Sequence, residues 1–254
     1  MELAERVAVV TGAGTGIGRA VALELSRRGA AVGLVGRTRA TLDAVAGEAK
    51  GEAFVATADV RERASVDAAF DAIRARLGPL HAVVANAGLG GPNDLGTGDR
   101  WEEIVRSNLD GAYFTLRAFE RNLAPATSWR HAIVISSCVA RFGVAGISAY
   151  SAAKAGQLGL VRSLAVELAP QRVLVNAICP GWVETQMAVD RMTEIGSGLG
   201  KSYPDVRGEL LAGIPLRRVS EPEEVAGLVA FLLSPAATAF TGQAFDLNNG
   251  AWMG

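Results

Sequence analysis

Seven short apolar runs, separated by helical patterns, constrain the fold of this chain more than any other feature. The runs span residues 6–11, 31–36, 53–57, 81–86, 131–136, 172–178 and 243–247. Most are apolar throughout instead of alternating with polar residues, which is typical of parallel strands that helices cover on both faces. The helical patterns span residues 16–28, 39–49, 62–77, 101–123, 150–169 and 221–233. This alternation predicts an α/β fold, a doubly wound parallel sheet of about seven strands that forms a single domain over residues 1–254.

One stretch, residues 186–216, does not fit this alternation. It is long, interrupted by glycine and weakly periodic, and it precedes a helix opened by Ser220, Glu221 and Pro222. A loop of this length in a compact domain is usually functional, often as a lid over a ligand. We therefore expect a substrate loop or lid at 186–216. The alternative is a small helical excursion at the surface.

The composition excludes several classes of protein. Half of the residues are hydrophobic and a fifth are charged, so the chain is expected to bury a sizeable core. The net charge of −1 predicts neither a nucleic-acid partner nor a membrane partner. No segment approaches the run of about 20 apolar residues that spans a membrane, and residues 1–12 contain no apolar signal core. Cys138 and Cys179 stand apart without a CxxC motif, so we expect a cytoplasmic protein with reduced thiols and no metal.

A glycine-rich turn joins the first apolar run to the first helical pattern. Its sequence, TGAGTGIG, places glycine at positions 12, 14, 16 and 18. Glycines let the backbone bend sharply and let a pyrophosphate approach the N–H groups of a helix N-terminus, where the helix dipole favours an anion. The position directly after a strand favours dinucleotide binding. The alternative is a turn that only packs a helix against a strand.

The end of the second apolar run indicates which dinucleotide binds. In sheets of this kind an acid at that point binds the ribose diol of NAD, whereas a basic residue suits the 2′-phosphate of NADP. This chain has Gly36 where the acid is expected, followed by Arg37 and Arg39, and a guanidinium binds phosphate well. We therefore expect NADP(H); the alternative is an Arg37 that is only solvated. Asp59, after the third run, either meets the adenine or caps the next helix.

Five polar residues are expected to meet at the edge of the sheet where parallel strands end. Ser136 and Ser137 follow the fifth run, Tyr150 and Lys154 lie one helical turn apart, and Asn108 stands beside an apolar helical stripe. A phenol with its ordinary pKa of about 10 is a poor acid at neutral pH, and a neighbouring ammonium lowers that pKa. This set of residues suits proton transfer to an oxygen while a hydride arrives at carbon.

With these motifs in place, the chain resembles the classical subgroup of the short-chain dehydrogenase/reductase family, which has a Rossmann-type fold. The resemblance rests on TGAGTGIG (11–18), NAG (86–88), Asn108, Ser137, the pentad YSAAK from Tyr150 to Lys154, and PGWVET (180–185). These motifs occur in the family's order and spacing over nearly the whole chain, down to TGQAFDLNNG (241–250).

The resemblance implies a role for each matched residue. Tyr150 is the general acid for carbonyl reduction and the base for alcohol oxidation, while Lys154 lowers its pKa and binds the nicotinamide ribose. Ser137 orients the substrate oxygen, and Asn108 holds a water in a proton relay that ends at Lys154. The cofactor-binding positions that it implies, besides Tyr150 and Lys154, are Gly12, Thr15, Gly16, Ile17, Gly18, Arg37, Asp59, Val60, Asn86, Ala87, Gly88, Pro180, Gly181, Val183 and Thr185. It also implies a homotetramer with the helices near 101–123 and 150–169 at one interface.

Three departures from the family pattern concern the site. Ala85 replaces the first Asn of the usual NNAG, and LNNG at 247–250 replaces VDGG, which puts the turn or pocket edge at Asn248 and Asn249 in doubt. Cys138 and Cys179 end neighbouring strands, so their thiols lie either near the cofactor or in the core as small hydrophobic groups.

These observations predict an NADPH-dependent enzyme that reduces a ketone, such as a 3-oxoacyl thioester, to a secondary alcohol. For a carrier-bound substrate, Arg130 and Arg172 are the candidate cations at the mouth of the site. One alternative is an NAD-dependent alcohol or sugar-alcohol dehydrogenase, against which Gly36 and Arg37 argue. Another is a regulator that binds a dinucleotide without turnover. Such a protein would have lost Ser137, Tyr150 or Lys154.

Overall fold

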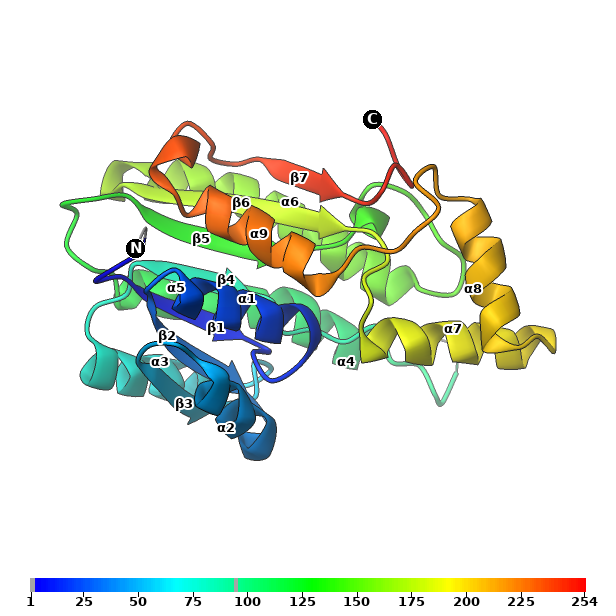
Figure 1. Cartoon of the computed structure of the whole chain (residues 1–254), viewed down its shortest axis with the longest axis horizontal. Helices are drawn as coiled ribbons and strands as arrows, with labels where there is room; N and C mark the ends of the chain where they lie inside the picture. The colour runs from blue at the N-terminus through cyan, green and yellow to red at the C-terminus, as the bar shows by residue number, and fades with distance from the viewer. Residues whose placement is uncertain (1–2, 94–95) are drawn as a thin grey trace.

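The computed structural model describes residues 3–93 and 96–254, which contain one seven-stranded parallel sheet (Figure 1). The strand order is β3-β2-β1-β4-β5-β6-β7, and every neighbouring pair is parallel. The strands are β1 Val7–Thr11, β2 Ala31–Gly36, β3 Ala53–Thr57, β4 Ala82–Ala85, β5 Arg130–Ile135, β6 Val173–Pro180 and β7 Ala244–Leu247. The order reverses between β1 and β4, and ligands bind at such a reversal in open α/β sheets.

Helices cover both faces of this sheet, so the doubly wound α/β fold is confirmed. One face is covered by α1 Gly16–Arg27, α2 Arg39–Glu48 and α9 Pro222–Leu232. The other is covered by α3 Arg63–Leu77, α5 Gly111–Arg121 and α6 Ser148–Leu168. Within the described residues, no helix has both the length and the apolar character that crossing a membrane requires.

The two covered faces explain why the strands are apolar throughout. Val9 in β1 and Val83 in β4 belong to the core cluster under α3, α5 and α6, whereas Val10 and Val84 belong to the cluster under α1, α2 and α9. All four side chains are fully buried. Because successive residues of a strand point to opposite faces, burial on both sides requires an apolar residue at every position.

The strand and helix bounds agree with the predicted ranges to within two residues, with one interruption. The predicted helix 101–123 is α4 Trp101–Val105, a π-turn at Arg106–Asp110 and α5. Asn108 lies in that π-turn and donates a hydrogen bond of 2.8 Å to the carbonyl of Ile104, four residues earlier. Such a side chain competes with the backbone N–H for the helical carbonyl. An apolar stripe alone does not predict this widening of the helix.

The segment 186–216 is mainly two helices and not the loop that the sequence predicts. They are α7 Gln186–Leu199, capped by the hydroxyl of Thr185, and α8 Tyr203–Ala212, which begins with a capping box of Ser202 and Asp205. Gly200 separates them in a left-handed conformation. Both helices extend beyond the sheet at the side where β6 ends (Figure 1). A small apolar cluster of their own, with Met192, Val206 and Val219 at its centre, holds them together.

The core cluster under α3 predicts a large loss of stability when the side chain of Phe70 is truncated. Phe70 is fully buried there, whereas Phe231 on α9 is 43% exposed. Phe70→Ala is expected to lower the free energy of unfolding by about 3–5 kcal/mol because it leaves a cavity. Phe231→Ala, the matched control, is expected to cost about 1 kcal/mol or less. Urea unfolding of both variants measures the difference, and equal losses would contradict this description of the core.

Candidate active site

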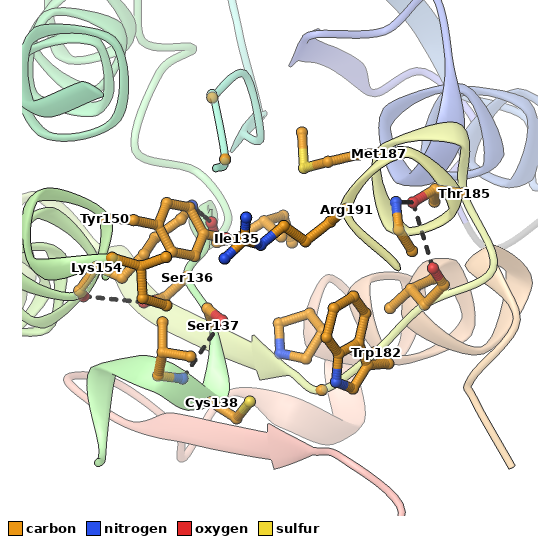
Figure 2. A pocket seen from close by; sticks show the side chains of 18 of the residues that line it. Ile135, Ser136, Ser137, Cys138, Tyr150, Lys154, Trp182, Thr185, Met187 and Arg191 are labelled. Carbon is orange, nitrogen blue, oxygen red and sulfur yellow. Dashed lines mark hydrogen bonds between the residues drawn. The ribbon is translucent and has the colours of Figure 1, made fainter. Parts of the chain in front are cut away.

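A cavity of about 370 Å³ lies at the carboxyl ends of β4, β5 and β6. The segments that follow these strands form one side of it, and α6 and α7 complete its walls (Figure 2). Of the predicted site residues it brings together Ile17, Asn86, Gly88, Asn108, Ser137, Tyr150, Lys154, Pro180, Gly181, Val183 and Thr185. The other predicted positions follow β1, β2, β3 and β4 at the same edge of the sheet, outside the cavity lining: Gly12, Thr15, Gly16, Gly18, Arg37, Asp59, Val60 and Ala87.

Lys154 is the buried charge at the centre of the site. Its side chain is 4% exposed, and its Nζ donates a hydrogen bond of 2.8 Å to the carbonyl oxygen of Ile135, the last residue of β5. The same Nζ lies 5.5 Å from the centre of the Tyr150 ring. The hydroxyl of Ser136 donates to the Lys154 carbonyl at 3.0 Å, which ties α6 to the end of β5. Two side chains one helical turn apart are thus held at the end of a central strand (Figure 2).

Burial determines the protonation of this pair. It raises the pKa of the Tyr150 hydroxyl to about 12, and a hydrogen bond with Ser137 offsets part of the shift. It lowers the pKa of the Lys154 ammonium to about 8. The pKa of Tyr150 therefore shifts in the opposite direction to the lowering expected from its neighbour, because desolvation of the phenolate dominates. At neutral pH the site holds a protonated phenol beside an ammonium group.

Asn108 is held on three sides in its π-turn. Besides the bond to Ile104, its side-chain Nδ2 donates a hydrogen bond of 2.8 Å to the carbonyl of Leu89. Its backbone carbonyl oxygen accepts a hydrogen bond of 2.8 Å from Nε2 of Gln157. Its Oδ1 is buried and has no partner among the described residues. That oxygen lies so close to Gly88 that a Cβ at position 88 would overlap it.

Gln157 is a residue of the site that the sequence analysis missed. It is 1% exposed and lies three residues after Lys154 on α6, so both side chains leave the same face of the helix. The signal was available, since Gln157 is the polar interruption in the apolar pattern of residues 155–161.

The glycine-rich turn is packed so closely that side chains at two positions are excluded. Gly12 has a φ of +66°, and a Cβ there would lie 2.9 Å from Nδ2 of Asn86. A Cβ at Gly18 would overlap the carbonyl oxygen of Gly12. Nδ2 of Asn86 donates to the carbonyl of Thr11 at 3.0 Å, which joins the end of β4 to this turn. The close packing therefore requires glycine at both positions.

The end of β2 presents one guanidinium group, that of Arg37, whose charge helps to lower the pKa of the nearby Asp59. Arg37 is exposed, and within the described residues its side chain forms no hydrogen bond or ion pair, whereas Arg39 is paired with Asp43 at 2.9 Å. Asp59 is paired with Arg61 at 2.6 Å, which lowers the pKa of its carboxyl group. The capping alternative for Asp59 is wrong, because the N-cap residue of α3 is Glu62.

Arg130 and Arg172 lie at the wrong edge of the sheet to be cations at the mouth of this cavity. Arg130 begins β5, at the end opposite Ile135, and Arg172 directly precedes β6. Arg130 is 2% exposed, and its guanidinium donates to the carbonyls of Ala124 and Gln171. Its buried guanidinium satisfies the carbonyls of the two segments that precede β5 and β6, and the prediction of a docking role is not supported.

Comparison with known proteins agrees with this geometry. A family model described as "Enoyl-(Acyl carrier protein) reductase" matches residues 12–251. The 3-oxoacyl-[acyl-carrier-protein] reductase of Pseudomonas aeruginosa is 36% identical over 259 residues, covering 100% of both chains. The cis-4-hydroxycyclohexanecarboxylate dehydrogenase of Sinomonas cyclohexanicum is 38% identical, covering 97% of this chain and 96% of the relative. A variant of the actinorhodin polyketide ketoreductase, solved with NADPH, is 31% identical with a TM-score of 0.89 and covers 97% of each chain.

The chain belongs to the short-chain dehydrogenase/reductase family. It is an enzyme, an oxidoreductase of the class that interconverts alcohols and carbonyl compounds. The expected family, fold and class of enzyme are thereby confirmed.

Two of the three departures of this dehydrogenase/reductase from its family pattern, the turn at Asn248 and Asn249 and the two cysteines, can be placed relative to the cavity. Asn248 accepts a hydrogen bond from the Gly250 N–H at 3.0 Å and, with Asn249, closes the turn after β7 without lining the cavity. Cys138 lines the cavity, whereas Cys179 lies in the core. Burial raises the pKa of both thiols, that of Cys179 to about 11, so both are neutral at neutral pH. Within the described residues, no cluster of three His, Cys, Asp or Glu side chains is arranged to hold a metal ion.

The lowered pKa of Lys154 predicts a pH-dependent contribution to stability. It is about 8 in the folded protein against 10.5 ordinarily, so between these values the unfolded chain binds more protons than the folded one. Burial of the charged amine lowers the free energy of unfolding by its full amount below about pH 8. As the pH rises above 8, the amine loses its proton and the free energy of unfolding increases by up to about 1.4 kcal/mol per pH unit. Lys154→Met removes this contribution.

Denaturant unfolding of wild type and Lys154→Met between pH 7 and pH 9.5 tests this. Above about pH 8, the free energy of unfolding of wild type should increase relative to that of Lys154→Met. A difference that is constant over this range would show that the amine titrates at its ordinary pKa.

Proposed function

We propose that this enzyme reduces a ketone to a secondary alcohol with NADPH, and that Tyr150 supplies the proton. When bound, the nicotinamide supplies a hydride to the carbonyl carbon. The phenol of Tyr150 donates its proton to the carbonyl oxygen in the same step, so that the ketone, NADPH and one proton become the alcohol and NADP⁺, and the phenolate left behind must be reprotonated. The observation that carries the proposal is the convergence of Ser137, Tyr150 and Lys154 on one cavity.

The protonation states support reduction in particular. A pKa of about 12 keeps Tyr150 protonated at neutral pH, which is the form that a proton donor needs. The ammonium of Lys154 stabilises the phenolate as it forms, because an opposite charge nearby favours the ionised form. The hydroxyl of Ser137, hydrogen-bonded to the phenol, orients the substrate oxygen.

A proton has to return to Tyr150 after each turnover, and Asn108 is suited to hold the water that carries it. The backbone carbonyl oxygen of Asn108 accepts one hydrogen bond from Gln157. A carbonyl oxygen has a second lone pair, which can accept a hydrogen bond from a water. We propose that this water leads to Lys154. Gln157 then fixes the direction of the remaining lone pair.

The residues at the other end of the site fit a dinucleotide phosphate. At Gly12 and Gly18 a Cβ would clash with Asn86 and with the Gly12 carbonyl, so glycine is what lets the chain turn this tightly into α1, and the N–H groups of a helix N-terminus suit a pyrophosphate. Thr15 and Gly16 complete this turn. The unpartnered guanidinium of Arg37, next to the uncharged Gly36, favours the 2′-phosphate of NADPH over the ribose diol of NADH.

For the remaining predicted contacts, we propose that Asp59 and Val60 meet the adenine and that Asn86, Ala87 and Gly88 border the cofactor. Pro180, Gly181, Val183 and Thr185 would hold the nicotinamide carboxamide, with Ile17 beneath the cofactor. Seven of these residues line the cavity: Ile17, Asn86, Gly88, Pro180, Gly181, Val183 and Thr185. We also propose that α7 acts as the lid, because Met187, Ala188 and Ile195 on it form a cavity wall.

The substrates named for the relatives support a 3-oxoacyl thioester or a similar ketone. Besides the Pseudomonas reductase, an acetoacetyl-CoA reductase of Synechocystis is 34% identical. The Sinomonas relative supports a second candidate, oxidation of a ring alcohol. We further propose a homotetramer, supported by the outer face of α6, where Val166 is 78% exposed and no atom lies near a Cβ at Gly159.

Replacement of the proton donor tests the mechanism. Tyr150→Phe is expected to lower turnover by more than about a hundredfold, the scale of general acid catalysis, with NADPH affinity unchanged. Tyr113→Phe is the control, because Tyr113 lies on α5 outside the cavity lining. Steady-state rates and NADPH fluorescence titration measure both effects. Near-normal turnover of Tyr150→Phe would refute the assignment.

Arg37 and Arg39 form a matched pair for testing cofactor choice. Arg37→Ala is expected to weaken NADPH binding about 10-fold or more while changing NADH binding by less than about threefold, because a charge-assisted bond to phosphate is lost. Arg39→Ala is expected to change neither, since its guanidinium is already paired with Asp43. Fluorescence titration with both nucleotides measures this, and equal weakening of the two nucleotides by Arg37→Ala would exclude phosphate recognition.

A further inference from the structure

The substrate side of the cavity carries one positive charge and no negative one. Its walls are mainly apolar, with contributions from Phe142, Val144, Ile147, Trp182 and Ile195. Of the described residues that line the cavity, none is acidic and two are cationic, Lys154 and Arg191. The amine of Lys154 is occupied by the Ile135 carbonyl. Arg191 is thus the cation available to a substrate.

Arg191 is directed into the cavity from α7. It lies four residues after Met187, on the same face of the helix, and Figure 2 shows its guanidinium extending from α7 between Tyr150 and Trp182. Its side chain is 25% exposed. A surface arginine would instead extend into solvent.

The guanidinium of Arg191 has hydrogen-bonding capacity to spare. Its Nη1 is bound to Glu194 at 2.7 Å, and Glu194 is half exposed and does not line the cavity. Within the described part of the chain, its Nε and Nη2 have no partner. These two N–H groups form the planar edge that binds a carboxylate through two parallel hydrogen bonds.

We propose that Arg191 is a specificity-determining residue that binds a carboxylate of the substrate, so that the natural ketone is an oxo acid. This inference rests on the proposed ketone reduction and names its substrate class. The carboxylate and the reacting carbonyl belong to one compact molecule, because Arg191 and Tyr150 line the same cavity of about 370 Å³. A phosphate at the far end of a pantetheine arm is too distant from a thioester-linked ketone for this geometry. An apolar spacer between the two groups suits the apolar walls.

Matched pairs of ketones test the inference. The probes are 4-oxocyclohexanecarboxylate and 4-oxopentanoate, each beside its methyl ester, and acetoacetyl-CoA, all with NADPH. Wild type is expected to have a kcat/KM for each acid at least about 10-fold above that for its ester. Arg191→Met is expected to lower kcat/KM for the acids by about 10- to 100-fold, mainly through KM, and to change that for the esters by less than about threefold. Arg191→Lys should restore part of the loss.

Lys201→Met controls for the loss of a positive charge nearby, in the segment that joins α7 and α8. Lys201 is paired with Glu209 and lies outside the cavity lining, so its replacement should leave all the kcat/KM values within about threefold of wild type. Equal loss on acids and esters in Arg191→Met, or no loss on either, would overturn the carboxylate assignment while ketone reduction stands. A loss on acetoacetyl-CoA as large as that on the acids would assign Arg191 to a phosphate and also overturn it. No oxidation of NADPH with any ketone would instead overturn the proposed function, and this inference with it.

Discussion

The active site depends on one buried ammonium group, that of Lys154. Its Nζ is satisfied by the carbonyl oxygen of Ile135 at 2.8 Å, and Ile135 lies one residue beyond the point where the neighbouring strand β4 ends, at the pair of Ala85 with Val134. A charge at 4% exposure is costly unless it is hydrogen-bonded. The end of a buried parallel strand supplies the acceptor. The same burial keeps the Tyr150 phenol protonated, so one environment prepares both groups.

The sheet makes this environment by exposing its carboxyl edge while both of its faces are covered. The strand order reverses between β1 and β4, so the glycine-rich turn after β1 and the segment after β4 diverge from neighbouring positions. Asn86 bridges them by bonding to Thr11, and the excluded Cβ positions at Gly12 and Gly18 keep the backbone close. The residues that we propose for the reaction and for the cofactor therefore lie on segments tied to the sheet. The wall that α7 adds belongs instead to a pair of helices, α7 and α8, which pack in a small cluster of their own.

The pattern of apolar residues and the spacing of motifs predicted the architecture well. Burial on both faces makes the strands apolar throughout, so they stand out in the sequence. Pattern and spacing failed where a local polar contact decides the structure. The π-turn at Asn108 depends on hydrogen bonds to Leu89 and Ile104, which no helical period reveals. The three glycines at 196, 198 and 200 resemble a loop, although capping by Thr185 and Ser202 supports two helices. The direction of the Tyr150 pKa shift depends on desolvation, which the sequence does not show.

The most direct test of the proposed ketone reduction identifies the carbon that receives the hydride. The family model is described for enoyl reduction, whereas we propose that Tyr150 protonates a carbonyl oxygen. Cyclohex-2-enone offers both a ketone and a conjugated double bond, and NADPH deuterated at the transferable position of its nicotinamide labels the carbon that is attacked. If the ketone is reduced, NMR of the product should show deuterium on the carbinol carbon of cyclohex-2-enol. Deuterium on the carbon β to an intact ketone, in a cyclohexanone product, would contradict this proposal.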